Sequence, residues 1–249
     1  MTSRHLIAGN WKMNLQTTLG TELADTLAEY ARTAGHIDML ICPPTTLLAS
    51  IWGRIACSSL RLGGQDCHAK ISGAHTGEIS AAMLRDVGCS HVIVGHSERR
   101  TNNGEDDLTV RAKAEAAQAA GLVTIVCVGE TMAERDTGNA RMVVERQLRG
   151  SLPNVSNAAK TVVAYEPVWA IGTGKTATLC DIAEMHGHIR RVLCDLMETG
   201  AEVRILYGGS VKPENSMEIL AAAEVSGALV GGASLKAKDF IAIAESVPK

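Results

Sequence analysis

Residues 123–128 read VTIVCV, and this run decides the fold because apolar, mostly β-branched residues follow one another almost without interruption. A strand with one exposed face alternates apolar and polar residues, whereas a continuous apolar run is typical of a strand buried on both faces of a parallel sheet. Seven further runs share this character: HLIAG (5–9), IDMLIC (37–42), LRLGG (60–64), HVIVG (91–95), TVVAY (161–165), VRILYG (203–208) and ALVGG (228–232). The sequence therefore predicts eight buried strands.

Helical patterns lie between these runs. Apolar residues keep helical spacing at Leu19, Leu23, Leu27 and Tyr30, and a second amphipathic pattern over residues 182–196 follows a capping-box signature from Thr178 to Asp181. Eight strand–helix units in 249 residues average about 31 residues each, close to the roughly 30 that one such unit needs. An open doubly wound sheet shows the same alternation, but the count of eight favours an α/β fold of the (β/α)8 TIM barrel type.

No Pro/Ser-rich linker or step in charge divides the chain, so we expect residues 1–249 to form a single domain. The formal charge is −3, which argues against nucleic acid or an anionic membrane surface as the main partner. No apolar run approaches the roughly 18 residues that a membrane span needs. Seven scattered cysteines without a CxxC pair indicate a reducing compartment and no zinc site, and we expect a cytoplasmic protein.

Polar residues follow several predicted strands where those strands end. Asn10 and Lys12 follow the first strand, His96 the fourth and Glu166 the sixth. The seventh and eighth strands run into glycine-rich turns, Gly208-Gly209-Ser210 and Gly231-Gly232. Catalytic residues of parallel barrels lie at the carboxyl ends of the strands. We therefore predict that a carboxylate, an imidazole and an ammonium group lie close together, next to two turns suited to phosphate.

Each of these residues also has a structural interpretation. Glu166 precedes Pro167, which holds it extended at the strand end, yet an isolated glutamate can be a surface carboxylate. His96 precedes SERR, which can open a helix whose dipole favours a neutral ring, yet a lone histidine is more often structural. Lys12 by itself can be a solvated lysine. Cys127 is interpreted as a packed thiol, because no histidine lies near it in the sequence.

The segment GTGKT (172–176) resembles two nucleotide-binding motifs without fitting either. A Walker A loop needs a glycine five positions before Gly174, where this chain has Trp169. The dinucleotide fingerprint needs a tight turn from strand to helix, and residues 167–171 intervene. We therefore expect no nucleotide cofactor here.

Six blocks in order carry a resemblance that spans the chain: AGNWKMN (8–14), VGHSERR (94–100), CVGET (127–131), YEPVWAIGTGKTA (165–177), YGGSVKPEN (207–215) and ALVGGASL (228–235). With these blocks the sequence closely resembles the triosephosphate isomerase family. The resemblance implies an eight-stranded (β/α) barrel, in agreement with the strand count, and an isomerase that interconverts dihydroxyacetone phosphate and D-glyceraldehyde 3-phosphate through an enediolate.

The resemblance also implies roles for individual residues. Glu166 would be the base that moves a proton between adjacent carbons, and His96 the electrophile that polarises the carbonyl. Lys12 and Asn10 would hold the substrate and its developing negative charge, while phosphate would bind at Gly172, Ser210, Gly231 and Gly232. Burial strengthens a carboxylate base, and a fixed cation stabilises an anionic intermediate. The use of a glutamate base with a neutral histidine in this family is a known example of pKa tuning.

Further expectations follow from the same resemblance. The family works as a homodimer without cofactor or metal, and residues 167–176 match its mobile lid, with Tyr207 and Ser210 as latch partners. Departures from the family pattern occur at His75 in the protruding interface loop, at Asp66, at Asn102-Asn103 and at Ser226. The first three bear on dimer contacts, and no consequence is assigned to Ser226.

Two other functions fit the same pattern. One is an isomerase of a related four-carbon sugar phosphate, although the lid and phosphate-loop blocks match the three-carbon enzymes without insertion. The other is a phosphate-binding barrel without catalysis, which the presence of Lys12, His96 and Glu166 disfavours.

Overall fold

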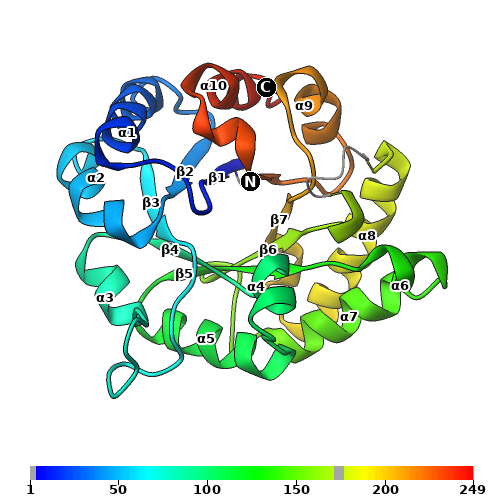
Figure 1. The fold of residues 1–249 in the computed structure, drawn as a ribbon. Helices are drawn as coiled ribbons and strands as arrows, with labels where there is room; N and C mark the ends of the chain where they lie inside the picture. The colour runs from blue at the N-terminus through cyan, green and yellow to red at the C-terminus, as the bar shows by residue number, and fades with distance from the viewer. Residues whose placement is uncertain (1–3, 171–176, 249) are drawn as a thin grey trace.

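Eight parallel strands form a closed barrel in the order β1 to β8, with β1 pairing to both β2 and β8 (Figure 1). The structure is a computed structural model that describes residues 4–170 and 177–248. The strands are β1 (Leu6–Asn10), β2 (Asp38–Cys42), β3 (Arg61–Gly64), β4 (His91–Val94), β5 (Val123–Val128), β6 (Thr161–Tyr165), β7 (Arg204–Tyr207) and β8 (Gly227–Val230). The predicted (β/α)8 barrel is confirmed.

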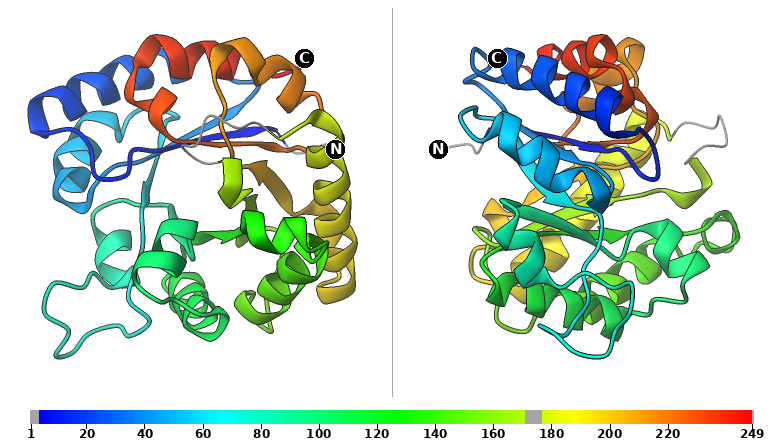
Figure 2. Two further views of the ribbon diagram at one scale, coloured as in Figure 1. Left: turned by 45° about the vertical axis from the view of Figure 1, so that its right-hand side comes forward. Right: turned by 60° about the vertical axis from the view of Figure 1, so that its left-hand side comes forward.

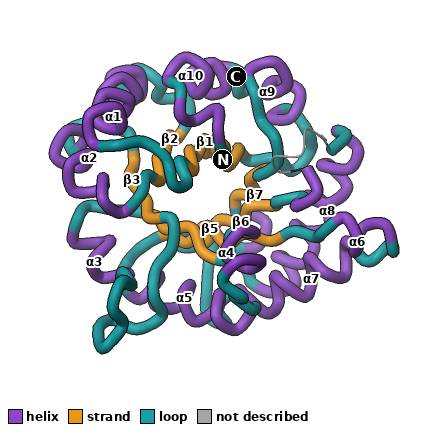
Figure 3. The backbone as a smooth tube through the Cα atoms, in the orientation of Figure 1, coloured by secondary structure: helices purple, strands orange, loops and turns teal. Residues whose placement is uncertain are grey.

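Helices surround the barrel and cover its outer face (Figures 2 and 3). The α-helices are α1 (Thr17–Ala31), α2 (Leu48–Ile55), α3 (Ala81–Asp86), α4 (Ser97–Asn102), α5 (Asp107–Ala119), α6 (Met132–Asp136), α7 (Ala140–Ser151), α8 (Leu179–Leu196), α9 (Pro213–Leu220) and α10 (Ala237–Glu245). Four short 3₁₀ helices also occur in the described part of the chain: η1 (Thr45–Leu47), η2 (Val168–Ala170), η3 (Gly200–Glu202) and η4 (Gly232–Leu235). None of the described helices is long and apolar enough to cross a membrane.

Two apolar clusters explain why the strands are apolar on both faces. Alternate strand residues such as Leu40, Ile125 and Leu206 fill the inside of the barrel. The intervening residues, such as Ile41 and Val126, pack outward against the helices. Both faces of each strand therefore exclude water, which requires the continuous apolar runs of the sequence.

The helix predictions are confirmed with one exception. Thr178 and Asp181 form a reciprocal capping box at the start of α8. On α1, Leu23 and Leu27 are buried, but the side chain of Leu19 is 60% exposed. The helical spacing predicted Leu19 on the buried face, and this was wrong because the first turn of α1 buries Gly20 instead, packed near Leu47 and Trp11.

A long segment between β3 and α3 protrudes from the body of the barrel (Figure 1). Near its base, the backbone N–H of His68 donates to the carbonyl of Ile79, which closes the two arms. The rings of His68 and His75 stack with their centroids 4.0 Å apart. Ile71 on this segment is 76% exposed, so the protrusion presents apolar surface to solvent.

Candidate active site

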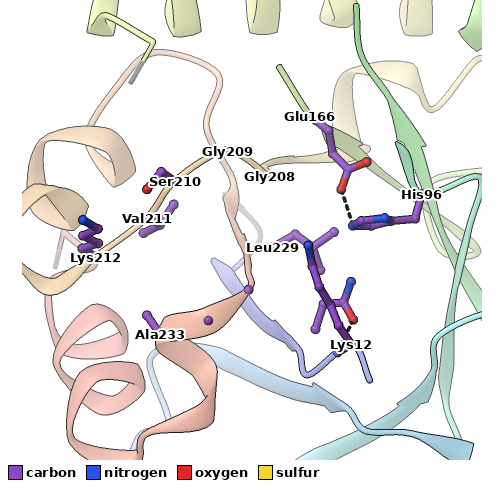
Figure 4. Close-up of a pocket in the computed structure, with 13 residues that line it drawn as sticks. Lys12, His96, Glu166, Gly208, Gly209, Ser210, Val211, Lys212, Leu229 and Ala233 are labelled. Atoms are coloured by element: carbon purple, nitrogen blue, oxygen red, sulfur yellow. Dashed lines mark hydrogen bonds and ion pairs between the residues drawn. The ribbon is translucent and has the colours of Figure 1, made fainter. Parts of the chain in front are cut away.

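A cavity of about 280 Å³ opens at the carboxyl end of the barrel (Figure 4). It brings together residues from strand ends far apart in the sequence: Asn10, Lys12, His96, Glu166, Gly208, Gly209, Ser210, Val211, Lys212, Leu229, Gly231, Gly232 and Ala233. Every described residue that the sequence analysis proposed for catalysis or binding lies in this set. Gly172 lies outside the described residues, as does the whole GTGKT segment.

Glu166 is held at the end of β6 by contacts on both carboxylate oxygens. Its Oε1 lies 2.9 Å from Nε2 of His96, and its Oε2 accepts a 2.9 Å hydrogen bond from the backbone N–H of Ser97. Burial alone would raise the pKa of Glu166, but the charge and hydrogen bond of His96, the Ser97 N–H and the charge of Lys12 together lower it. The carboxylate is therefore ionised although its side chain is only 2% exposed.

His96 caps the first turn of α4, and this position orients its ring. Nδ1 accepts a 3.2 Å hydrogen bond from the backbone N–H of Glu98. An acceptor nitrogen carries no proton, so this contact assigns the ring proton to Nε2, which faces Glu166. Burial lowers the pKa of His96, but the charge and hydrogen bond of Glu166 raise it overall. If Glu166 moves away from the ring, its charge and hydrogen bond no longer raise the pKa of His96. The neutral imidazole expected from the sequence is then favoured.

Lys12 occupies a strained backbone position with φ of 51°, in the left-handed region that costs a residue with a side chain about 1–3 kcal/mol. Its backbone N–H donates to Oδ1 of Asn10 at 3.1 Å, and its carbonyl accepts from Nε2 of Gln65 at 2.7 Å. Its ammonium group pairs with the carboxylate of Glu98. These contacts fix the lysine at the cavity.

Gln65 was not predicted as a site residue, and it also donates to the carbonyl of Cys42 at 2.9 Å. Gln65 thereby ties the turn after β1 to the end of β2. No local pattern marks it as functional. The only signal in the sequence is its position directly after the predicted third strand, because active sites in these barrels lie at the carboxyl ends of the strands.

The two glycine turns form the opposite wall of the cavity. A side chain on Gly209 would come within 2.2 Å of the hydroxyl oxygen of Tyr207, so this position requires glycine. Gly232 begins η4, and a side chain there would meet open space. Asn215 donates from Nδ2 to the carbonyl of Ser210 at 3.1 Å and steadies the first turn. Bare backbone of this kind can approach an anion closely.

Glu130, which is fully buried, anchors the segment that leaves β6. Its Oε1 accepts hydrogen bonds from the hydroxyl of Tyr165 at 3.1 Å and from Nε1 of Trp169 at 2.8 Å. The guanidinium of Arg135 lies 4.7 Å from the centre of the Trp169 ring. The beginning of the segment that resembles a lid is thus held firmly, whereas its tip, 171–176, lies outside the described residues.

The remaining candidates near the site have structural explanations. Cys127 is fully buried inside the barrel, and burial raises the pKa of its thiol well above the ordinary value, so it is a packed thiol as the sequence predicted. Within residues 4–170 and 177–248, no group of three or more histidine, cysteine, aspartate or glutamate side chains is placed to hold a metal ion. Two histidines on α8, His186 and His188, are not part of the cavity lining and make separate contacts, with the carbonyls of Glu224 and Arg141.

A closed parallel barrel with a buried carboxylate, an imidazole and an ammonium group at its carboxyl end defines a (β/α)8-barrel enzyme. Comparison with known proteins identifies the family. The family model described as triosephosphate isomerase matches residues 5–247, so the chain belongs to the triosephosphate isomerase family. The reaction of that family is the interconversion of dihydroxyacetone phosphate and glyceraldehyde 3-phosphate.

Individual relatives support the same conclusion along the whole chain. The triosephosphate isomerase of Afipia carboxidovorans is 59% identical, and that of Rhodopseudomonas palustris is 57% identical; each alignment covers 98% of both chains. The crystal structure of triosephosphate isomerase from Bartonella henselae is 46% identical and superposes with a TM-score of 0.90, covering 98% of this chain and 99% of that one.

Proposed function

We propose that Glu166 is the base of the isomerisation and that His96 is its electrophile. The carboxylate of Glu166 removes a proton from the carbon next to the carbonyl, and Nε2–H of His96 donates to the carbonyl oxygen as negative charge develops there. The observation that carries this proposal is the 2.9 Å contact between Oε1 of Glu166 and Nε2 of His96. A substrate carbon and oxygen placed between these two groups would face a base and a donor at once.

Lys12 supplies the fixed positive charge for the intermediate and the phosphate dianion. Asn10 positions Lys12 and contributes a polar group to the same wall. Ser210, Gly231 and Gly232 bind phosphate through the two glycine turns, together with Gly172 in the lid. None of these steps calls for a cofactor or a metal, because the proton is returned to the neighbouring carbon by the same carboxylate.

The two alternatives from the sequence are less well supported than the three-carbon reaction. An isomerase for four-carbon sugar phosphates would need room for a further carbon, and the cavity of about 280 Å³ is already small. A barrel without catalysis would have no use for an ionised carboxylate held 2% exposed beside a histidine.

The assembly that we propose is a homodimer of single-domain chains in the cytoplasm. A second hollow beside the site shares Asn10, Lys12 and His96 with the active-site cavity and is also lined by Met13, which is 94% exposed. A protruding segment, residues 69–78, which exposes Ile71, is available on the same chain to fill the equivalent hollow of a partner. His75 and Asn102-Asn103, which depart from the family pattern, would lie at that contact.

The test is turnover of glyceraldehyde 3-phosphate, with formation of dihydroxyacetone phosphate followed through a coupled dehydrogenase. Glu166→Ala is expected to lower kcat about 100- to 10,000-fold while the protein stays folded. Glu29→Ala removes an exposed glutamate on α1 and should leave kcat unchanged. Near-normal turnover by a folded Glu166→Ala variant would refute the assignment of the base.

A further inference from the structure

The amino end of the barrel, opposite the active site, is closed by a layer of charged side chains. Asp38 begins β2, Arg61 begins β3, Arg204 begins β7, and Arg4 lies two residues before β1. Asp38, Arg61 and Arg204 each lie two residues before Leu40, Gly63 and Leu206, and residues two apart on a strand share a face. Leu40 and Leu206 fill the barrel interior. Because all eight strands are parallel, the residues that begin them lie together at the end of the barrel opposite the active-site cavity.

Three guanidinium groups in this layer share one carboxylate. Asp38 contacts Arg204 at 2.8 Å, Arg4 at 3.1 Å and Arg61 at 3.4 Å. The layer therefore carries two positive charges more than its single aspartate balances. The side chains of Asp38 and Arg204 are only 12% and 16% exposed, so water screens this excess poorly.

Neighbouring groups do not remove the imbalance. Arg190 lies in the same hollow, but it is paired with Glu224 at 2.8 Å. Glu202 also lines the hollow and is exposed to solvent. Even if Glu202 balances one of the two excess positive charges, the described residues of the layer keep one positive charge in excess. The adjacent ring of His91 is neutral, because burial and the positive charges of Arg61 and Arg204 lower its pKa to about 3.

The arginines retain hydrogen-bonding capacity toward a ligand. A guanidinium has five N–H donors, yet among the described residues the side chain of Arg204 donates one hydrogen bond, and that of Arg61 makes only the 3.4 Å contact. Burial lowers the pKa of Arg204, and the positive charges of Arg61 and Arg4 lower it further although Asp38 raises it. Like charges thus repel one another in this layer.

The layer opens into a hollow of about 900 Å³ that is lined by Arg4, Asp38, Arg61 and Arg204 and shares no residue with the active-site cavity. Arg61 is 38% exposed and Arg4 is 54% exposed, so their unused donors are accessible from this hollow. Planar guanidinium groups bind oxyanions in a bidentate manner. We propose that the amino end of the barrel is a second ligand site, which binds a small polyvalent oxyanion between Arg4, Arg61 and Arg204.

The experiment is calorimetric titration of the full chain with pyrophosphate at fixed ionic strength. The wild-type protein is expected to bind pyrophosphate at two sites per chain, one in the active site and one at the amino end of the barrel. Lys12→Met should weaken the first, and the Arg4→Gln/Arg61→Gln double variant should weaken the second about tenfold or more. Arg141→Gln, which removes a cation that is 57% exposed elsewhere on the surface, should leave both sites intact.

Two further measurements keep the test decisive. Turnover by the double variant should stay at the wild-type level, which shows that the barrel is folded. If the double variant does not fold, Arg61→Lys keeps the charge but removes the planar fork, and a weakened second site is again expected. Citrate in place of pyrophosphate distinguishes carboxylates from phosphates as the ligand. An unchanged two-site isotherm in the arginine variants, or a single site in the wild-type protein, would overturn the proposal.

Discussion

At the scale of single residues, the site depends on a few side chains whose partners come from distant parts of the chain. Glu166 is positioned by His96 and by the backbone of Ser97, about 70 residues earlier in the sequence. Their places at strand ends predicted that Glu166, His96 and Lys12 converge, and the family resemblance implied their roles. The sequence could not predict Gln65 as an orienting partner, because its contact with Lys12 exists only once the barrel has brought the ends of β1 and β3 together. The contact of His96 with the N–H of Glu98 is local to the start of α4.

Lys12 gives a prediction at this scale. Lys12→Met keeps the length of the side chain but removes the positive charge, so kcat/KM for the sugar phosphate should fall about 100-fold or more. Lys238→Met, at an exposed lysine on α10, is the matched control. Steady-state kinetics checks the prediction, and an unchanged kcat/KM in the Lys12 variant would rule out its electrostatic role.

At the scale of elements, strands were predictable and their exact ends less so. The run at 161–165 coincides with β6, which Lys160 and Glu166 bound on both sides, and the run at 123–128 coincides with β5, which Gly129 follows. β8 ends at Val230 rather than at residue 232, because Gly231 and Gly232 leave the sheet to form the turn into η4. Leu19 was misplaced because helical spacing alone does not say which turn of a helix meets the barrel.

Helix α8 carries a buried histidine that makes stability depend on pH. Burial lowers the pKa of His186 from 6.5 to about 4. In the unfolded chain the histidine binds a proton at a higher pH, so the unfolded state is favoured as the pH falls from about 6.5 toward 4. Burial of the neutral His186 ring therefore costs no proton above about pH 6.5, and the free energy of unfolding falls as the pH drops from 6.5 toward 4.

Urea unfolding at pH 7.5 and pH 5, at fixed protein concentration, measures this effect. The free energy of unfolding of the wild-type protein is expected to fall by about 2 kcal/mol more than that of His186→Gln over this interval. His36→Gln, at an exposed histidine, should behave like the wild type. The same pH dependence in the His186 variant as in the wild type would contradict this explanation.

At the scale of the whole molecule, alternation of strands and helices alone did not distinguish a barrel from an open sheet. The count of eight favoured the barrel, and the pairing of Leu6 with Gly227 and of Ile7 with Ala228 closes it. The charged layer at the amino end was not predicted, because Asp38, Arg61 and Arg204 are strand-start residues with no local motif in common. Only closure of the sheet brings their side chains to one place.

The proposed dimer also belongs to this scale. Met13 is 94% exposed beside the active site, and an aspartate there would replace apolar surface by a charge at the proposed contact. Met13→Asp is expected to shift the protein from dimer to monomer in sedimentation equilibrium and to lower kcat. Val155→Asp, at a position 93% exposed on another part of the surface, should remain dimeric. A monomeric wild-type protein with full activity would contradict the proposed assembly.

The measurement that tests the proton transfer most directly is exchange of the carbon-bound hydrogen of dihydroxyacetone phosphate in D2O, followed by NMR over many turnovers. If Glu166 moves the proton, deuterium must enter the carbon next to the carbonyl, and Glu166→Ala must slow this exchange by the same factor as turnover. Continued isomerisation with no deuterium at that carbon, or wild-type exchange in the Glu166→Ala variant, would contradict the account.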